Sequence, residues 1–159
     1  MSPVTVIGCG LRREQLTLEA AQALERCDKV LLHTRRCGLA DYLSEKNIPF
    51  ETLDALYDAA EDFDQHVRLA VQAVLDAARE GSVAYAVFDV RDVSAQALIK
   101  SGADVRVIAG PPLEEGLWAY AEGATDCWAA SEWEAWTLHA DRNASFANWT
   151  RANWPPRSN

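Results

Sequence analysis

Two short loops hold residue types that suit ligand binding. Gly8-Cys9-Gly10 follows the β-branched run at residues 4–7, and glycine there permits a tight turn and close approach of the backbone to a ligand. Asp89-Val90-Arg91-Asp92 follows the apolar run at residues 83–88. In open α/β sheets, ligands bind outside the carboxyl ends of the strands. We therefore expect the loop at residues 89–92 to lie at a binding crevice.

The first loop departs from the known nucleotide-binding patterns. A dinucleotide fingerprint needs a third glycine at position 13, where this chain has Arg13, and no acidic residue closes the second predicted strand. The chain also has no Gly-Lys-Ser/Thr P-loop. These departures argue against NAD binding and against a phosphate-binding P-loop.

The three histidines, His33, His66 and His139, lie far apart in the sequence. His66 falls on the polar side of a predicted helix, and we expect it to be solvated. His33 follows a predicted strand together with Thr34 and Arg35, so it is the better candidate for a catalytic role. No Ser-His-Asp order can be assigned.

The cysteines and the acidic residues match no metal-binding pattern. Cys9, Cys27, Cys37 and Cys127 form neither a Cys-x-x-Cys pair nor a zinc spacing. We expect free thiols in partly buried sites, with a reactive Cys9 as the alternative. The acidic run at residues 54–64 reads as a solvated loop and helix start. Metal binding is the alternative there, although the spacing fits no calcium loop.

Composition limits the classes of partner. The chain has 159 residues, a net charge of −9 and a pI of about 4.7. Nucleic acids and anionic membrane surfaces both attract basic faces, so neither is an expected partner. No apolar segment approaches the roughly 20 residues that span a bilayer. The N-terminus lacks a signal-peptide pattern, so we expect a cytoplasmic protein.

The chain alternates between predicted strands and predicted helices. Residues 64–80 form the clearest helix, because Val67, Ala70, Val71 and Val74 begin an apolar stripe at helical spacing, and we expect Gly81 to end it in the left-handed conformation. Strands are expected at residues 4–7, 29–32, 50–53, 83–88 and 105–108, and the other helices at 17–27, 39–46, 94–101 and 113–122. We expect Thr17 to cap the first of these helices. This alternation predicts an α/β fold with a mostly parallel, five-stranded sheet flanked by helices.

The character of the sequence changes near residue 123. All six tryptophans lie at or beyond Trp118. We therefore predict an α/β domain at residues 1–123 and a Trp-rich extension and tail packed on it at residues 124–159, with residues 125–142 forming a strand and then a helix. The indoles either cover an otherwise exposed surface or form a dimer or partner interface.

Four segments in order, 4–36 (VTVIGCGLRREQLTLEAAQALERCDKVLLHTRR), 48–65 (IPFETLDALYDAAEDFDQ), 85–92 (YAVFDVRD) and 102–112 (GADVRVIAGPP), resemble the N-terminal domain of tetrapyrrole (corrin/porphyrin) methylases. The resemblance covers roughly residues 3–122. More narrowly, the chain is similar to the methylase-like domain that precedes MazG-type pyrophosphohydrolase domains. The resemblance implies methyl transfer from S-adenosylmethionine held between two α/β domains. The implied cofactor-binding residues are Gly8, Gly10, Asp89, Gly110 and Pro111.

The chain also departs from the family pattern. Leu11-Arg12-Arg13 replaces Pro-Gly-Asp in the first loop, and Phe88-Asp89-Val90-Arg91 replaces Pro-Gly-Asp/His-Pro after the fourth strand. Asp89 adds a Cβ and a charge where glycine would let the backbone approach a cofactor. Two interpretations follow. The first is a methyltransferase whose missing second domain comes from a partner or dimer mate. The second is a non-catalytic interaction or regulatory module that forms a homodimer or binds a partner protein.

Overall fold

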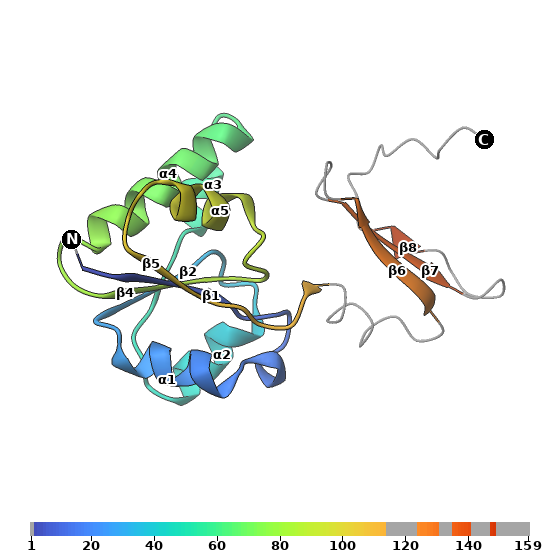
Figure 1. The fold of residues 1–159 in the computed structure, drawn as a ribbon, viewed down its shortest axis with the longest axis horizontal. Coiled ribbons are helices and arrows are strands. Elements are labelled where there is room, and N and C mark those ends of the chain that lie inside the picture. The colour runs from blue at the N-terminus through green and yellow to red at the C-terminus, as the bar shows by residue number, and fades with distance from the viewer. Residues whose placement is uncertain (1, 114–123, 131–134, 141–146, 149–159) are drawn as a thin grey trace. The chain divides into compact units, whose positions relative to one another are not determined.

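The computed structural model describes residues 2–113, 124–130, 135–140 and 147–148. The chain divides into two units, Met1–Pro111 and Pro112–Asn159 (Figure 1). The predicted domain boundary after residue 123 stays a prediction, because residues 114–123 lie outside the described part. No helix within the described ranges has the length and apolar character needed to cross a bilayer.

A five-stranded parallel sheet forms the centre of the first unit, in the order β3-β2-β4-β1-β5. Val4 pairs with Val83 on one side and with Val105 on the other, and every ladder is parallel. The strands are β1 (Val4–Gly8), β2 (Lys29–Leu32), β3 (Glu51–Thr52), β4 (Val83–Val87) and β5 (Val105–Ile108). The predicted parallel α/β fold is therefore confirmed.

Helices cover both faces of this sheet (Figure 1). The first face carries α1 (Leu18–Arg26) and α2 (Gly38–Glu45), and the opposite face carries α3 (Asp54–Ala59), α4 (Phe63–Ala77) and α5 (Val93–Lys100). A short 3-10 helix, η1 (Arg13–Gln15), lies between β1 and α1. Parallel sheets need this coverage because both of their faces are apolar.

The central strand β4 divides the core into two clusters. All five of its residues are buried. Val83, Tyr85 and Val87 pack with α4 and α5, whereas Ala84 and Ala86 pack with α1 and α2. This alternation follows from the two-residue period of a strand, and it places the larger side chains toward α4.

The ends of the helices show one correct prediction and two errors. Thr17 caps α1 as predicted, its Oγ1 accepting a hydrogen bond from the Ala20 N–H at 3.1 Å. Residues 54–59 form a helix where we predicted a loop. Gly81 does not adopt the predicted left-handed conformation, since only Gly10, Asn47 and Gly102 among the described residues have positive φ. A Cβ on Gly81 would instead lie 2.8 Å from Asp28 Oδ2, so glycine makes room for that carboxylate.

The second unit contains an antiparallel sheet with the order β6-β7-β8. Its strands are β6 (Ala124–Ala130), β7 (Ala135–Ala140) and β8 (Ala147–Asn148). The predicted strand in this region is confirmed, but the predicted helix after it is wrong, because β7 pairs along β6 and completes its ladder. Trp136 and Thr137 have high strand propensity, which agrees with this outcome. The predicted helix at residues 113–122 lies almost entirely outside the described residues.

Candidate functional site

Two of the predicted cofactor glycines contact each other at the carboxyl ends of β1 and β5. A Cβ on Gly8 would lie 2.8 Å from the Gly110 N atom, and a Cβ on Gly110 would lie 2.0 Å from the Gly8 O atom. Neither distance is tolerable, so glycine is required on both sides. The structure thus brings Gly8 and Gly110 together, and their missing side chains make room for the neighbouring strand. Pro111 follows directly in the same loop.

The backbone of the first loop is hydrogen-bonded within the protein. The Cys9 N–H donates to the Val87 carbonyl at 2.8 Å, and the Gly10 N–H donates to the Phe88 carbonyl at 3.0 Å. These two bonds extend the β1–β4 pairing past the ends of the strands. The loops after β1 and β4 are thereby held against each other.

Gln15 occupies the turn that follows Gly10. Its Oε1 accepts hydrogen bonds from the N–H groups of Leu11 (2.9 Å) and Arg12 (3.0 Å). Gly10 has a φ of +68°, which favours glycine, and a Cβ there would lie 2.8 Å from the same Gln15 oxygen. Successive N–H groups in such a turn normally form an anion-binding concavity. Here a side-chain amide of the chain itself fills it.

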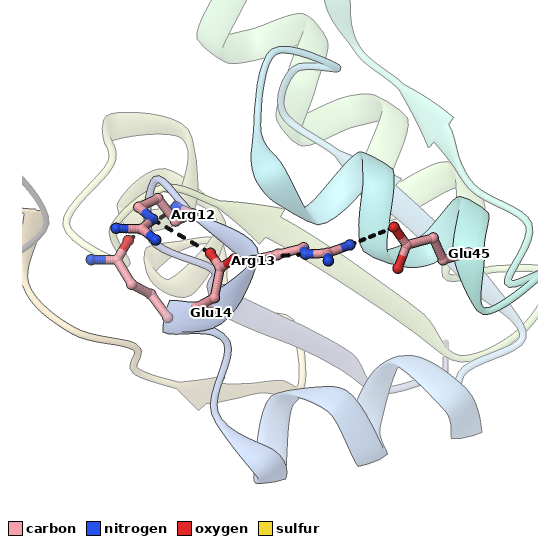
Figure 2. A network of polar contacts seen from close by, with 5 residues as sticks. Arg12, Arg13, Glu14 and Glu45 are labelled. Carbon is pink, nitrogen blue, oxygen red and sulfur yellow. Dashed lines mark hydrogen bonds and ion pairs between the residues drawn. The ribbon is translucent and has the colours of Figure 1, made fainter.

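The two arginines of the first loop make surface ion pairs (Figure 2). Arg13 Nη1 lies 2.5 Å from Glu45 Oε1 at the end of α2, and Arg12 Nε lies 3.4 Å from Glu14 Oε2. All four side chains are exposed, so solvent screening leaves each pair with little effect on stability. Their effect is positional, because Arg13 links the first loop to α2.

Asp89 is folded back onto its own loop. Its side chain is only 12% exposed. The carboxylate accepts hydrogen bonds from the N–H and Nε of Arg91, both at 2.9 Å, and Arg91 Nη2 lies 2.5 Å from Oδ2. This forked pairing is the arrangement in which arginine binds carboxylate most strongly. The structure therefore places Asp89 at the carboxyl end of β4 as predicted, with its charge paired by Arg91.

His66 contradicts the expectation of a solvated side chain. It is 3% exposed, and neither ring nitrogen has a hydrogen-bond partner among the described residues. Its ring meets the rings of Tyr57, His33 and Phe63, with centroid distances of 5.1, 5.6 and 6.3 Å. Burial lowers the pKa of His66 and the neighbouring His33 lowers it further, while Asp92 opposes them. The sequence held a signal, because His66 lies four residues before Ala70 on the apolar stripe of α4.

A chain of hydrogen bonds connects His33 to the start of α5. His33 Nδ1 lies 3.3 Å from the Tyr85 hydroxyl, which lies 2.7 Å from Ser94 Oγ. Ser94 Oγ in turn donates to Asp92 Oδ1. Burial raises the pKa of Tyr85, so its hydroxyl stays protonated. This series of hydrogen bonds orients the His33 ring at the carboxyl end of β2, where we predicted that this residue would lie.

The first residue of the acidic run has a structural role. Asp54 accepts hydrogen bonds from Thr34 Oγ1 at 2.6 Å and from the Arg35 N–H at 2.8 Å. Burial alone would raise the pKa of Asp54, but these hydrogen bonds outweigh it and lower the pKa. Within the described ranges, no group of three or more His, Cys, Asp or Glu side chains could hold a metal ion.

A comparison with solved structures shows the fold. The chain is similar to the uroporphyrin-III-C-methyltransferase from Thermus thermophilus, with a TM-score of 0.54 and 22% sequence identity. The match covers 80% of this chain and 59% of that chain. No family model matches the chain, and no curated protein matches it. The chain therefore has the α/β fold of a tetrapyrrole methyltransferase and spans less than two thirds of that protein's length.

Proposed function

We propose that this chain is a tetrapyrrole-methylase-like domain of the S-adenosylmethionine-dependent methyltransferase class, degenerate in its cofactor loops, that serves as a non-catalytic interaction module. One observation carries the proposal. The backbone N–H groups of residues 9–12 all donate to acceptors within the protein. A cofactor that needs these donors would have to displace Gln15 and the carbonyl groups of Val87 and Phe88.

The other proposed cofactor residues support the same conclusion. S-adenosylmethionine would supply a methyl group on a sulfonium, with a carboxylate and an adenosine for the protein to hold. Gly8 and Gly110 already contact each other, and the Asp89 carboxylate is paired with Arg91. As arranged, these residues do not fit the cofactor, so we assign no catalytic step to them.

An active methyltransferase is the second candidate. The fold match and the glycines at three expected positions, Gly8, Gly10 and Gly110, favour it. On this alternative, a dimer mate or a partner protein completes the cofactor cleft, and the first loop opens when the cofactor binds. Positioning of the methyl donor would then supply most of the rate acceleration.

The interaction partner is proposed from composition and resemblance. The six tryptophans at or beyond Trp118 supply the residue type most enriched in binding hot spots. A second copy of the chain is the first partner to test. A MazG-type pyrophosphohydrolase domain is the next, because the sequence is similar to domains that precede one.

Thermal unfolding with S-adenosylmethionine or S-adenosylhomocysteine tests the proposal. A ligand at 100 times its Kd stabilises a protein by about 2.7 kcal/mol, a shift of several degrees in Tm. We expect no shift for the wild-type chain. Gln15→Ala frees the N–H groups of Leu11 and Arg12. This variant tests whether the Gln15 side chain is what prevents cofactor binding. Gln65→Ala is the matched control, because Gln65 Oε1 also accepts a backbone N–H, from Glu61. A dose-dependent shift in the wild type would favour the active methyltransferase.

Sedimentation velocity tests the interaction role separately. We expect the full chain to sediment as a homodimer. A strictly monomeric chain at high concentration would remove the homodimer from the proposal and leave a partner protein as the only route to an interaction role.

A further inference from the structure

Two aromatic side chains are exposed together where the chain passes from α3 to α4. Tyr57 is 63% exposed and Phe63 is 46% exposed. Both rings contact the ring of His66, with centroid distances of 5.1 and 6.3 Å, so they belong to one patch. Single apolar residues are common on protein surfaces, but exposed apolar groups that lie together mark interaction sites.

Exposed carboxylates occupy the same two helices and the connection between them. Within the part of the chain that the structure describes, none of these carboxylates belongs to an ion pair, and residues 47–67 contain no Lys or Arg. The patch therefore combines an apolar centre with negative charge that the chain itself does not neutralise. We call it the acidic aromatic surface, and it consists of Tyr57, Asp58, Glu61, Asp62, Phe63 and Asp64.

A buried polar side chain lies against the two exposed rings. His66 is 3% exposed, and neither of its ring nitrogens has a hydrogen-bond partner among the described residues. Buried polar groups in native proteins are normally paired. The imidazole therefore offers an unused donor and an unused acceptor directly behind Tyr57 and Phe63, which is a second and independent indication that this surface receives a partner.

We propose that the acidic aromatic surface binds a basic peptide segment of a partner protein that carries an aromatic anchor. Arginine side chains of the segment pair with the exposed carboxylates and stack on the rings of Tyr57 and Phe63, and the anchor covers the remaining apolar area. Nucleic acids and anionic membranes carry the wrong charge for this surface. The inference deepens the proposed interaction role and rests on it, because it names the chemistry of the partner.

Fluorescence anisotropy with a labelled synthetic peptide of repeated Arg-Trp-Ser units tests the proposal on the full chain. We expect saturable binding that weakens as salt is added, because the charges are exposed. Two control peptides carry glutamate in place of arginine or serine in place of tryptophan. Each should bind at least about tenfold more weakly, since the surface needs both the positive charge and the aromatic anchor.

Matched variants show whether the peptide binds at this surface. Tyr57→Ser should weaken binding by about fivefold or more, whereas Leu18→Ser should not, because Leu18 is 83% exposed but lies in α1 on the opposite face of the sheet. The double variant Asp58→Asn, Asp64→Asn should also weaken binding. Its control is Glu25→Gln, Asp41→Asn, which removes two exposed carboxylates from α1 and α2.

The outcomes separate this inference from the proposed function. The inference is overturned if the Arg-Trp-Ser peptide does not bind, or if the surface variants and their controls bind it equally well. A chain that binds neither this peptide nor S-adenosylmethionine overturns the inference alone, whereas S-adenosylmethionine binding in the thermal assay overturns the proposed non-catalytic role. The three peptides are compared on the wild-type chain, so this comparison is decisive even where a variant fails to fold.

Discussion

Replacing His66 with leucine should stabilise the protein, which is unusual for a change at a buried position. The wild-type side chain is 3% exposed and leaves both ring nitrogens without partners among the described residues. An unsatisfied buried polar group costs about 1–3 kcal/mol. The leucine would lose the edge contacts with His33 and Tyr57, worth about 0.5–1.5 kcal/mol. The net expectation is a gain of about 1 kcal/mol.

The pH dependence provides the more specific signature. The pKa of His66 is lowered below its ordinary value of 6.5 in the folded chain. Below pH 6.5 the unfolded chain takes up a proton that the folded chain does not, so stability falls as the pH drops toward the lowered pKa. Above pH 6.5 His66 is neutral in both the folded and the unfolded chain, so it no longer contributes to the pH dependence of stability. His66→Leu should therefore lose less stability than the wild type between about pH 7 and about pH 5.

Urea unfolding of both proteins across this pH range is the assay. Gln72→Leu is the control, because it makes a polar-to-apolar change at an exposed position of the same helix, where substitutions usually alter stability by less than about 0.5 kcal/mol. A His66→Leu variant that is less stable than the wild type at neutral pH, with a parallel pH profile, would show that the buried imidazole does not destabilise the folded chain.

Three further substitutions test the other contacts of the first unit by urea unfolding. Tyr85→Phe removes the hydroxyl between His33 and Ser94 and should cost about 1–2 kcal/mol; no loss would show that the hydrogen-bond chain is unimportant. Gly110→Ala places a Cβ against the Gly8 backbone and should cost more than about 3 kcal/mol, whereas Gly102→Ala has open space and should cost only about 1–2 kcal/mol for its positive φ; equal costs would contradict the contact. In the wild type, the Asp54 carboxylate adds to the free energy of unfolding above the ordinary pKa of 3.8, and this contribution is lost as the pH falls through the lowered pKa. Asp54→Asn should remove the contribution, so the stability of this variant should fall less steeply at acid pH than that of the wild type.

The sheet could be predicted because its signals are local. The run at residues 83–87 is uniformly apolar, and such a run suits a strand buried on both faces. Thr17 could be assigned as a cap from its position before an apolar stripe. Strand order and the identity of the two faces required the structure, since they depend on pairing between distant segments.

The features that escaped prediction depend on tertiary contacts. The sequence predicts that Gly81 adopts the left-handed conformation after the helix, but in the structure it makes room for the Asp28 carboxylate. The sequence pattern places His66 on the polar side of its predicted helix, but α4 turns this side chain toward the core. Gln15 gave no signal at all, because its role requires the loop to fold back on it. Residues 135–140 became a strand because β6 lies beside them to pair with.

Isothermal titration calorimetry of the full chain with S-adenosylmethionine measures whether the first loop excludes the cofactor. The N–H groups of residues 9–12 are already hydrogen-bonded within the protein, so we expect no saturable heat up to a ligand concentration of about 1 mM. Saturable one-to-one binding with a Kd of about 100 μM or tighter would show that the first loop accepts the cofactor, and it would contradict the proposal that the loop is closed.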